Sequence, residues 1–348
     1  MRIDTIEKSY INVSGKIYDS EFINLVNIKD GRIALDERTL FLTKKEKEAL
    51  NAHPIKSFEN AVYVFKYGDV YGLIADVPIG EYRVGNIKCH ELVLPDTVQG
   101  MLSNLHGYNS EAAPVLLGHK KRVDYQTFIE GEKFSEHFIF EDIDIYVFCG
   151  KEAEQITSEF QDTESLYVAD GHHRLYTTSL SGFKNSVLSC LINFDYLEIL
   201  PIHRIIPNVD AQLFEKAKEF IFNRFDVLDG ETPLSKGKVR IYYESEKFVV
   251  NLIELNSDAF WNNDIYRLNT QIISQAFRIF DTNSLEYISD DDFKKYKEFS
   301  KRKDVIIETY PIELEEFIEC ADNNCIMPPK STWFSPKFPS FLIFKQYQ

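Results

Sequence analysis

An acid, a glycine, two histidines and an arginine follow one another in the middle of the chain, at Asp170, Gly171, His172, His173 and Arg174. The apolar residues before them, SLYVA, predict a strand, and the spacing of RLYTTSL after them is compatible with a helix that ends at Ser181-Gly182. The glycine between these elements predicts a tight turn. The two histidines and the arginine would then lie in the first turn of the helix.

This arrangement is typical of an anion-binding site. The first N–H groups of a helix have no partner within the helix, and the helix dipole places a partial positive charge there. Glycine lets a ligand approach the backbone closely, and the guanidinium of Arg174 is a forked donor that suits phosphate. A capped helix that carries histidines by chance is the competing interpretation.

The carboxylate of Asp170 has two interpretations. As an N-cap it would accept hydrogen bonds from the exposed N–H groups of the helix, which is a structural role. As a functional group it could bind Mg²⁺ on a polyphosphate. His172 and His173 point in different directions on a helix, so we expect one to pack in the core and one to face the ligand, without a shared metal.

A second candidate group lies in NIKCHELVLPD, residues 86–96. His90 and Glu91 follow a short predicted strand and precede a proline turn and a helix. The carboxylate of Glu91 could serve as a general base, because a base must be held near the proton that it accepts. A pair of surface residues is the structural alternative.

The tail IMPPKSTWFSPKFPSFLIF, residues 326–344, contains four prolines. Prolines at this density exclude a helix and predict a semi-rigid loop. Such a loop would present its polar side chains at a fixed place, and these are Lys330, Ser331, Thr332 and Lys337.

The predicted elements place these groups in a mixed α/β, or α+β, protein. Residues 1–85 predict a β-rich N-terminal elaboration with one helix, which Thr43 would cap. Residues 86–207 alternate strand and helix and contain the phosphate-binding turn, and residues 208–348 form a C-terminal α+β region whose loop returns to the site. Prolines flank the strand LPIHRIIP, so we interpret its polar residues, His203 and Arg204, as a structural pair at a sheet edge.

The composition limits the classes of function. The chain has 348 residues, of which 44% are hydrophobic, so it can bury a substantial core. The formal net charge of −16 disfavours nucleic acid as a partner, because phosphate neutralisation needs a basic face. No apolar run is long enough for a membrane span or a signal peptide. We therefore expect a cytoplasmic protein.

Six segments together resemble a bacterial and archaeal family of unknown function, of the DUF1015 type, that is marked by an ADGHHR signature. YGLIADV, IKCHE, APVLLG, YVADGHHR, LPIHRII and MPPKSTWFSPKFPS occur in the family's order through most of the chain. The family is in turn similar to the free serine kinases and to the ParB and sulfiredoxin nucleotide-binding superfamily. The resemblance implies a ParB/sulfiredoxin-like nucleotide-binding core with elaborations at both ends.

The resemblance also implies roles for individual residues. In the free serine kinases the glutamate of the His-Glu pair is the base for the serine hydroxyl, and the aspartate of the turn is needed as well; these correspond to Glu91 and Asp170, with Asp170 also the ligand of Mg²⁺. The phosphates of ATP or ADP would be bound by Gly171, His172, His173 and Arg174. The substrate would be contacted by His90, Lys330, Ser331 and Thr332.

Some positions depart from the family's pattern. Family members usually begin with a Pro-Pro-Tyr-Asp stretch, which is absent here before Tyr71. After the His-Glu pair they often carry a lysine and an Asp-Arg pair, where this chain has Thr97 and Gln99-Gly100. The lost basic positions could weaken nucleotide binding or change the ligand. Cys89 does not correspond to the sulfiredoxin nucleophile, which lies inside the turn, so sulfinate reduction is disfavoured.

The leading expectation is a nucleotide- and Mg²⁺-dependent kinase that acts on the alcohol group of a small hydroxylated metabolite, with free serine as the first candidate. The alternative is a non-catalytic, nucleotide-binding regulatory protein of the ParB-like type, and a scaffold with a relic pocket is a third class. The sequence leaves open which nucleotide and acceptor are bound, and whether the chain forms a homodimer.

Overall fold

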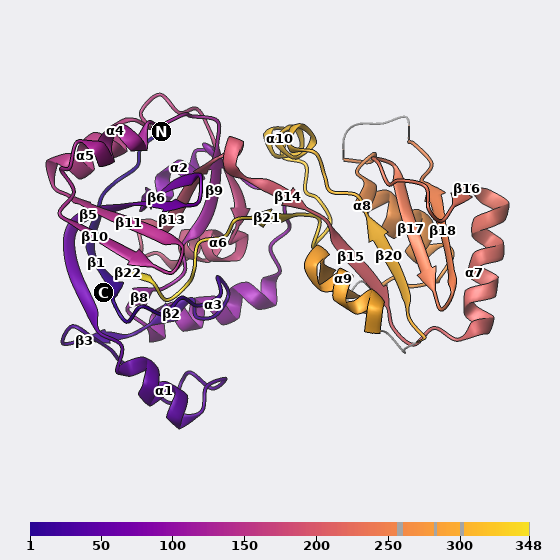
Figure 1. The fold of residues 1–348 in the computed structure, drawn as a ribbon, viewed down its shortest axis with the longest axis horizontal. Coiled ribbons are helices and arrows are strands. Elements are labelled where there is room, and N and C mark those ends of the chain that lie inside the picture. The colour runs from indigo at the N-terminus through magenta and orange to yellow at the C-terminus, as the bar shows by residue number, and fades with distance from the viewer. Residues whose placement is uncertain (256–259, 282–283, 300–302, 348) are drawn as a thin grey trace. The chain divides into compact units, whose positions relative to one another are not determined.

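The structure is a computed structural model that describes residues 1–255, 260–281, 284–299 and 303–347. The chain divides into two compact units (Figure 1). The first unit consists of Met1–Cys89, Val93–Leu197 and Pro336–Gln348, and the second consists of His90–Leu92 and Glu198–Ser335. Both units combine helices with sheets, which confirms the mixed α/β class.

The first unit surrounds one large sheet. Its helices are α1 (Lys44–Asn51), α2 (Ile79–Arg83), α3 (Pro95–Gly107), α4 (Tyr125–Glu130), α5 (Lys151–Ser158) and α6 (His172–Ser181), and η1 (Phe194–Tyr196) is a 3-10 turn. Its strands are β1 (Ile6–Asn12), β2 (Leu25–Val26), β3 (Ile28–Lys29), β4 (Arg32–Ile33), β5 (Ile55–Tyr67), β6 (Val70–Pro78), β7 (Ile87–Lys88), β8 (Ser110–Glu111), β9 (Val115–His119), β10 (Glu136–Phe140), β11 (Ile143–Cys149), β12 (Leu166–Asp170), β13 (Ser186–Asn193) and β22 (Ile343–Gln346).

The large sheet has 12 strands, with ten in the order β2-β8-β22-β1-β5-β6-β13-β9-β12-β7. The other two, β10 and β11, pair with each other, and β11 pairs with β5. Two pairs are parallel, β13 with β9 and β12 with β7. Strands from residues 1–85 and from residues 86–207 therefore share this sheet, and the last strand of the chain joins it as well.

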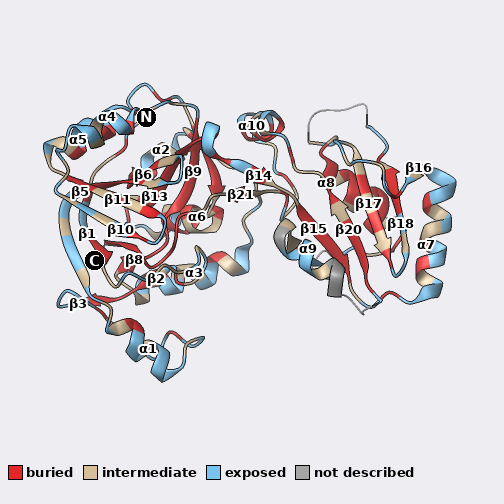
Figure 2. Ribbon diagram, in the orientation of Figure 1, coloured by how far each residue is buried: buried red, intermediate tan, exposed pale blue. Residues whose placement is uncertain are grey.

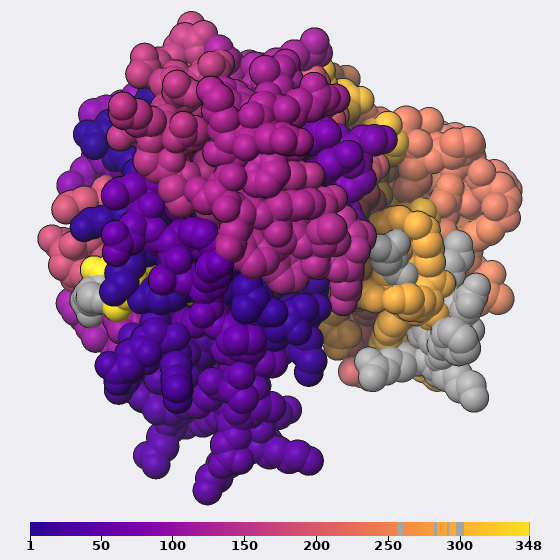
Figure 3. Space-filling view, turned by 60° about the vertical axis from the view of Figure 1, so that its left-hand side comes forward, coloured from indigo at the N-terminus to yellow at the C-terminus, as the bar shows by residue number. Residues whose placement is uncertain are grey.

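Local signals in the sequence explain several elements of this unit. Thr43 caps α1 in a capping box, because its hydroxyl accepts from the N–H of Glu46 and the Glu46 carboxylate accepts from the N–H of Thr43. A turn at Gly68 joins β5 to β6 as an antiparallel pair. The segment around α1 projects from the unit (Figures 1 and 3). The predicted helix cap at Thr43 is confirmed.

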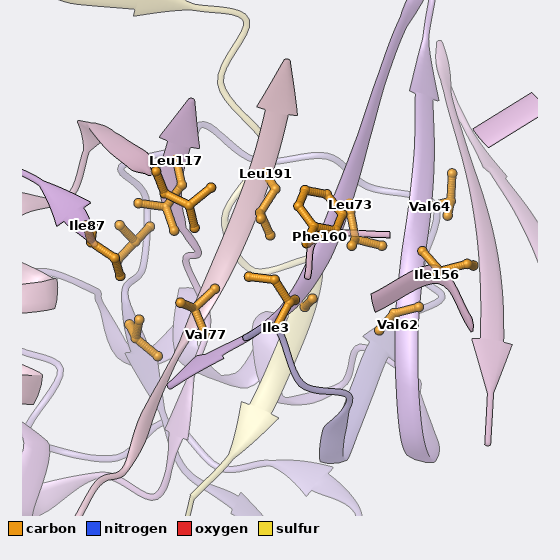
Figure 4. Close-up of a cluster of buried hydrophobic side chains, with 14 of the residues drawn as sticks. Ile3, Val62, Val64, Leu73, Val77, Ile87, Leu117, Ile156, Phe160 and Leu191 are labelled. Carbon is orange, nitrogen blue, oxygen red and sulfur yellow. The ribbon is translucent and has the colours of Figure 1, made fainter. Parts of the chain in front are cut away.

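The main core of the first unit is an apolar cluster between the sheet and its helices. Figure 4 shows side chains from β5, β6, β9 and β13 meeting Ile156 and Phe160, of α5 and the turn after it. Apolar burial at this scale is the main force that stabilises such a sheet. The strands of both units are mostly buried, whereas the outer faces of α1, α5 and α7 are exposed (Figure 2).

The second unit has its own sheet, in the order β16-β18-β17-β20-β15-β19, and a separate pair of β14 with β21. Its core includes Phe214, Ala217 and Ile221, which lie on one face of α7. Its helices are α7 (Ala211–Arg224), α8 (Asp264–Arg267), the π-helical η2 (Leu268–Ser274), α9 (Asp290–Phe299) and α10 (Leu314–Asp322). Its strands are β14 (Glu198–Leu200), β15 (Ile202–Ile206), β16 (Asp226–Asp229), β17 (Lys238–Tyr243), β18 (Glu246–Asn251), β19 (Glu286–Ser289), β20 (Val305–Thr309) and β21 (Trp333–Ser335).

His203 and Arg204 have a structural role, as predicted. The prediction that they lie at a sheet edge is wrong. β15 lies between β20 and β19, and both side chains are 1% exposed. His203 Nδ1 accepts a hydrogen bond from the Thr309 N–H at 3.1 Å, and Arg204 donates to the Lys330 carbonyl at 2.8 Å. Hydrogen bonds let these polar side chains lie inside the sheet. The flanking prolines bound the strand and do not place it at an edge.

Within the described residues, none of the helices combines the length and the apolar character that a membrane crossing requires.

Candidate functional site: a charged turn between β12 and α6

The strand, turn and helix predicted at the DGHHR segment are confirmed. β12 ends at Asp170, Gly171 is the N-cap residue with φ of +95°, and α6 begins at His172. Only glycine adopts this backbone conformation without strain. A Cβ atom on Gly171 would also lie 3.0 Å from the guanidinium of Arg174, so any other residue would push that side chain away.

Asp170 is held by two cations. Its Oδ2 accepts from Arg174 Nη2 at 2.5 Å, and its Oδ1 accepts from Lys337 Nζ at 2.8 Å. Burial alone would raise the pKa of Asp170, but Arg174 and Lys337 outweigh this effect and hold the pKa below its ordinary value. Of the two interpretations of Asp170, the N-cap is wrong, because Gly171 occupies that position and the carboxylate faces the two cations.

Arg174 is fixed by backbone groups as well as by Asp170. Because β12 and β9 are antiparallel, the end of β12 lies beside the start of β9. Arg174 Nη1 donates to the carbonyls of Ala113 and Pro114, just before β9, at 2.9 and 2.8 Å. The side chain is 18% exposed. The guanidinium is therefore pre-positioned at the first turn of α6, where an anion would be attracted.

The two histidines have different surroundings. His172 is buried, which lowers its pKa to about 4 against the opposing influence of Asp170. His173 is half-buried, and its Nε2 accepts from the N–H of Leu94 at 3.0 Å, so this nitrogen carries no proton. The expectation that one histidine packs is confirmed for His172. His173 connects α6 to the segment that leads into α3.

Lys337 completes a group with Asp170, Gly171 and Arg174, which we call the charged turn. The sequence alone gave Lys337 no role in this group. It lies 167 residues after Asp170 and also approaches Glu21 at 3.4 Å. The side chain is 13% exposed, so the ammonium lies in a partly desolvated place. The dense prolines around it, at Pro336 and Pro339, were the signal that this segment presents a side chain rigidly.

The remaining predicted site residues lie in the second unit, in two segments that contact each other. His90 is buried, and its Nε2 lies 2.9 Å from the hydroxyl of Thr332. Glu91 forms a parallel β-bridge with Met327, and the Met327 N–H donates to the His90 carbonyl at 2.7 Å. Ser331 is buried and donates to a backbone carbonyl, whereas Lys330 is exposed. The His-Glu segment and the proline-rich loop are thus one local group.

The residues around Asp170 do not fit a resident Mg²⁺ ion. Both carboxylate oxygens already accept hydrogen bonds from cationic side chains, which would repel a divalent cation. Among the residues that the structure describes, no group of three or more His, Cys, Asp or Glu side chains is arranged to hold a metal ion. A Mg²⁺ requirement stays a prediction.

The buried His172 should make the protein sensitive to acid. Its pKa is about 4 in the folded protein and 6.5 ordinarily, so between these values only the unfolded chain binds the proton. The free energy of unfolding should therefore fall by up to about 1.4 kcal/mol per pH unit as the pH drops through that window. His172→Asn should flatten the profile of melting temperature against pH between 7 and 5.

Two comparisons make this test specific. His106 on α3 is exposed, and His106→Asn should keep the wild-type slope. His119 is buried and also has a pKa of about 4, so His172→Asn should remove only part of the slope. If the melting temperature of wild type and of His172→Asn falls with pH at the same slope, the lowered pKa of His172 is contradicted.

The fold and the turn define a mixed α+β protein with a half-buried turn, rich in charged side chains, between a strand and a helix. The chain belongs to the family described as protein of unknown function (DUF1015), whose model matches residues 59–272, more than half of its length. The family membership expected from the sequence is thereby confirmed. No curated protein matches the chain.

Several solved structures are similar to the chain at low identity. A free serine kinase mutant in complex with ADP is 13% identical, with a TM-score of 0.43, over 76% of this chain and 88% of that chain. SbnI with a C-terminal truncation, from Staphylococcus aureus, is 12% identical, with a TM-score of 0.46, over 78% of this chain and 86% of that chain. A conserved hypothetical protein from Pyrococcus furiosus is 13% identical, with a TM-score of 0.42, over 77% and 93%.

Proposed function

We propose that this protein is a nucleotide-dependent phosphotransferase that acts on a small hydroxylated metabolite, with free serine as the first candidate. The observation that carries the proposal is the charged turn, where Arg174 and Lys337 hold one carboxylate beside the start of α6. Glu21 lies 3.4 Å from Lys337, so the two cations face two carboxylates, and the positive end of the α6 dipole adds to the hydrogen-bond donors of Arg174 and Lys337. This arrangement favours a bound phosphate.

Phosphoryl transfer depends mainly on positioning and on the electrostatic stabilisation of phosphate oxygens. In the proposed site, Gly171 lets the nucleotide approach the backbone, and Arg174 and Lys337 supply charge and hydrogen bonds to its phosphates. Asp170 keeps both cations in place. His173 lies in the same first turn as the buried His172.

The residues proposed to bind and activate the acceptor alcohol are inferred from the order of motifs along the chain, which resembles that of the free serine kinases. Glu91 is the proposed general base for the acceptor hydroxyl, and His90, Lys330, Ser331 and Thr332 are the proposed substrate contacts. The contact between His90 and Thr332 supports a common role for these segments. A non-catalytic nucleotide-binding protein is the second candidate, because α3 has Thr97 and Gln99-Gly100 where family members often carry a lysine and an Asp-Arg pair.

One experiment separates these functions. The protein is incubated with serine and with ATP, ADP or CTP, with and without MgCl₂; nucleotide binding is followed by thermal shift and product by detection of O-phosphoserine. If the protein is a kinase, we expect both a thermal shift with a nucleotide and the formation of O-phosphoserine. A shift without product from serine or other small alcohols supports the regulatory candidate, and no shift with any nucleotide refutes both.

Lys337→Gln should weaken nucleotide binding at least tenfold, because a charge-assisted hydrogen bond contributes about 1.5–3 kcal/mol. Isothermal titration at low and moderate salt would measure the dissociation constant, and the loss should be larger at low salt. Lys151→Gln, at an exposed position of α5, is the matched control and should bind as wild type does. An unchanged affinity for folded Lys337→Gln would remove Lys337 from the phosphate site.

A further inference from the structure

A cavity of about 440 Å³ lies in the first unit beside the charged turn. This volume falls in the range of small-molecule sites. Its walls come from the segment at residues 21–25, from α3 and from α6. Apolar side chains such as Met101 and Leu105 alternate there with polar ones such as Asn104 and Thr177. A cavity with this lining suits a ligand that is mainly apolar and has a few hydrogen-bonding groups.

The cavity adjoins the charged turn through two residues. Arg174 forms part of its wall and is paired with Asp170. Glu21 also lines the cavity and lies 3.4 Å from Lys337. A ligand in the cavity would therefore have its anionic end at Arg174 and Lys337. The other acid in the lining, Glu111, is already paired with Lys184 at 2.5 Å.

An exposed aromatic ring borders the cavity. Phe41 lines it and yet is 67% exposed. The segment before Phe41 is anchored: Thr39 is buried with its hydroxyl 3.3 Å from that of Tyr108, and the Arg38 guanidinium lies over the Tyr108 ring. The ring is thus held at the cavity by its neighbours, with apolar area left for a planar ligand to cover.

We propose that this cavity binds the base and ribose of the nucleotide, with the base stacked on Phe41 and the phosphates directed to Arg174 and Lys337. The inference rests on the proposed nucleotide-dependent function and adds where the base and the ribose of the nucleotide bind. Asn104, Thr39 and Tyr108 supply hydrogen-bonding groups for the base edge and the ribose. Phe41 accordingly determines affinity for the nucleoside part and has no effect on the phosphates.

Two neighbouring surface residues provide the test. Phe41→Ala should weaken ADP binding about tenfold, as expected for the loss of one base-stacking contact. Leu40→Ala is the matched control, because Leu40 is 87% exposed, adjacent, and outside the cavity lining. Pyrophosphate lacks the base and the ribose, so it should bind to Phe41→Ala as it binds to wild type. Titration calorimetry would measure all five dissociation constants.

A second pair of variants blocks the cavity from α3. Asn104 and Ser103 are both exposed, but only Asn104 lines the cavity. Asn104→Trp should weaken ADP binding more than tenfold, and Ser103→Trp should leave it unchanged. Wild-type affinity for ADP in both Phe41→Ala and Asn104→Trp would overturn the inference and leave the proposed function intact. A wild-type protein that binds no nucleotide would refute the proposed function itself and, with it, this inference.

Discussion

Replacing Glu91 by glutamine should lower the rate of phosphoryl transfer to serine by about 10²–10⁴-fold and leave nucleotide affinity nearly unchanged. Glutamine keeps the size of the side chain but cannot accept the hydroxyl proton. The backbone pairing of Glu91 with Met327 fixes this segment against the proline-rich loop.

The measurement is the initial rate of O-phosphoserine formation, with the nucleotide thermal shift recorded on the same samples. Glu319→Gln, at an exposed position of α10 in the same unit, is the matched control and should keep the wild-type rate. A Glu91→Gln protein that forms product as fast as wild type would show that another group is the base. Loss of both rate and thermal shift would indicate that Glu91 supports nucleotide binding instead.

The strand, turn and helix at Asp170 could be predicted because each signal is local. An apolar run, a glycine and a helical spacing occupy fewer than twenty residues, and only glycine suits the observed φ of +95° at Gly171. The helix after Thr43 was predictable for the same reason, because a capping box lies within one turn. Such elements depend little on the rest of the chain.

The partners of Asp170 could not be predicted by local reasoning. Lys337 reaches Asp170 across 167 residues, through the position of the last strand in the sheet. The N-cap interpretation failed because two cations bind the carboxylate more strongly than the helix N–H groups could, and one of these cations is outside the local sequence. The contact of His90 with Thr332, across 242 residues, became foreseeable only through the order of the family's motifs.

The last strand of the chain is also tied to the sheet by four buried charges. Lys345 of β22 forms ion pairs with Asp76 of β6 and with Glu111 of β8, the latter at 3.8 Å. Glu111 also pairs with Lys184. Burial raises the pKa of Asp76, whereas the two lysines outweigh burial at Glu111 and lower its pKa. The cluster is neutral as a whole, so removing one member leaves a buried charge without compensation.

Lys345→Met should therefore destabilise the protein by about 3–5 kcal/mol, the range for breaking a buried ion pair by removing one partner. Urea unfolding would measure this as a lower transition midpoint. The double variant Lys345→Met/Asp76→Asn should recover part of the loss, because it removes the carboxylate left unpaired. Lys44→Met is the control at an exposed pair, where little change is expected because solvent screens the interaction. If the free energy of unfolding of Lys345→Met is lower than that of wild type by less than about 1 kcal/mol, water or rearranged side chains compensate the charges of Asp76 and Glu111.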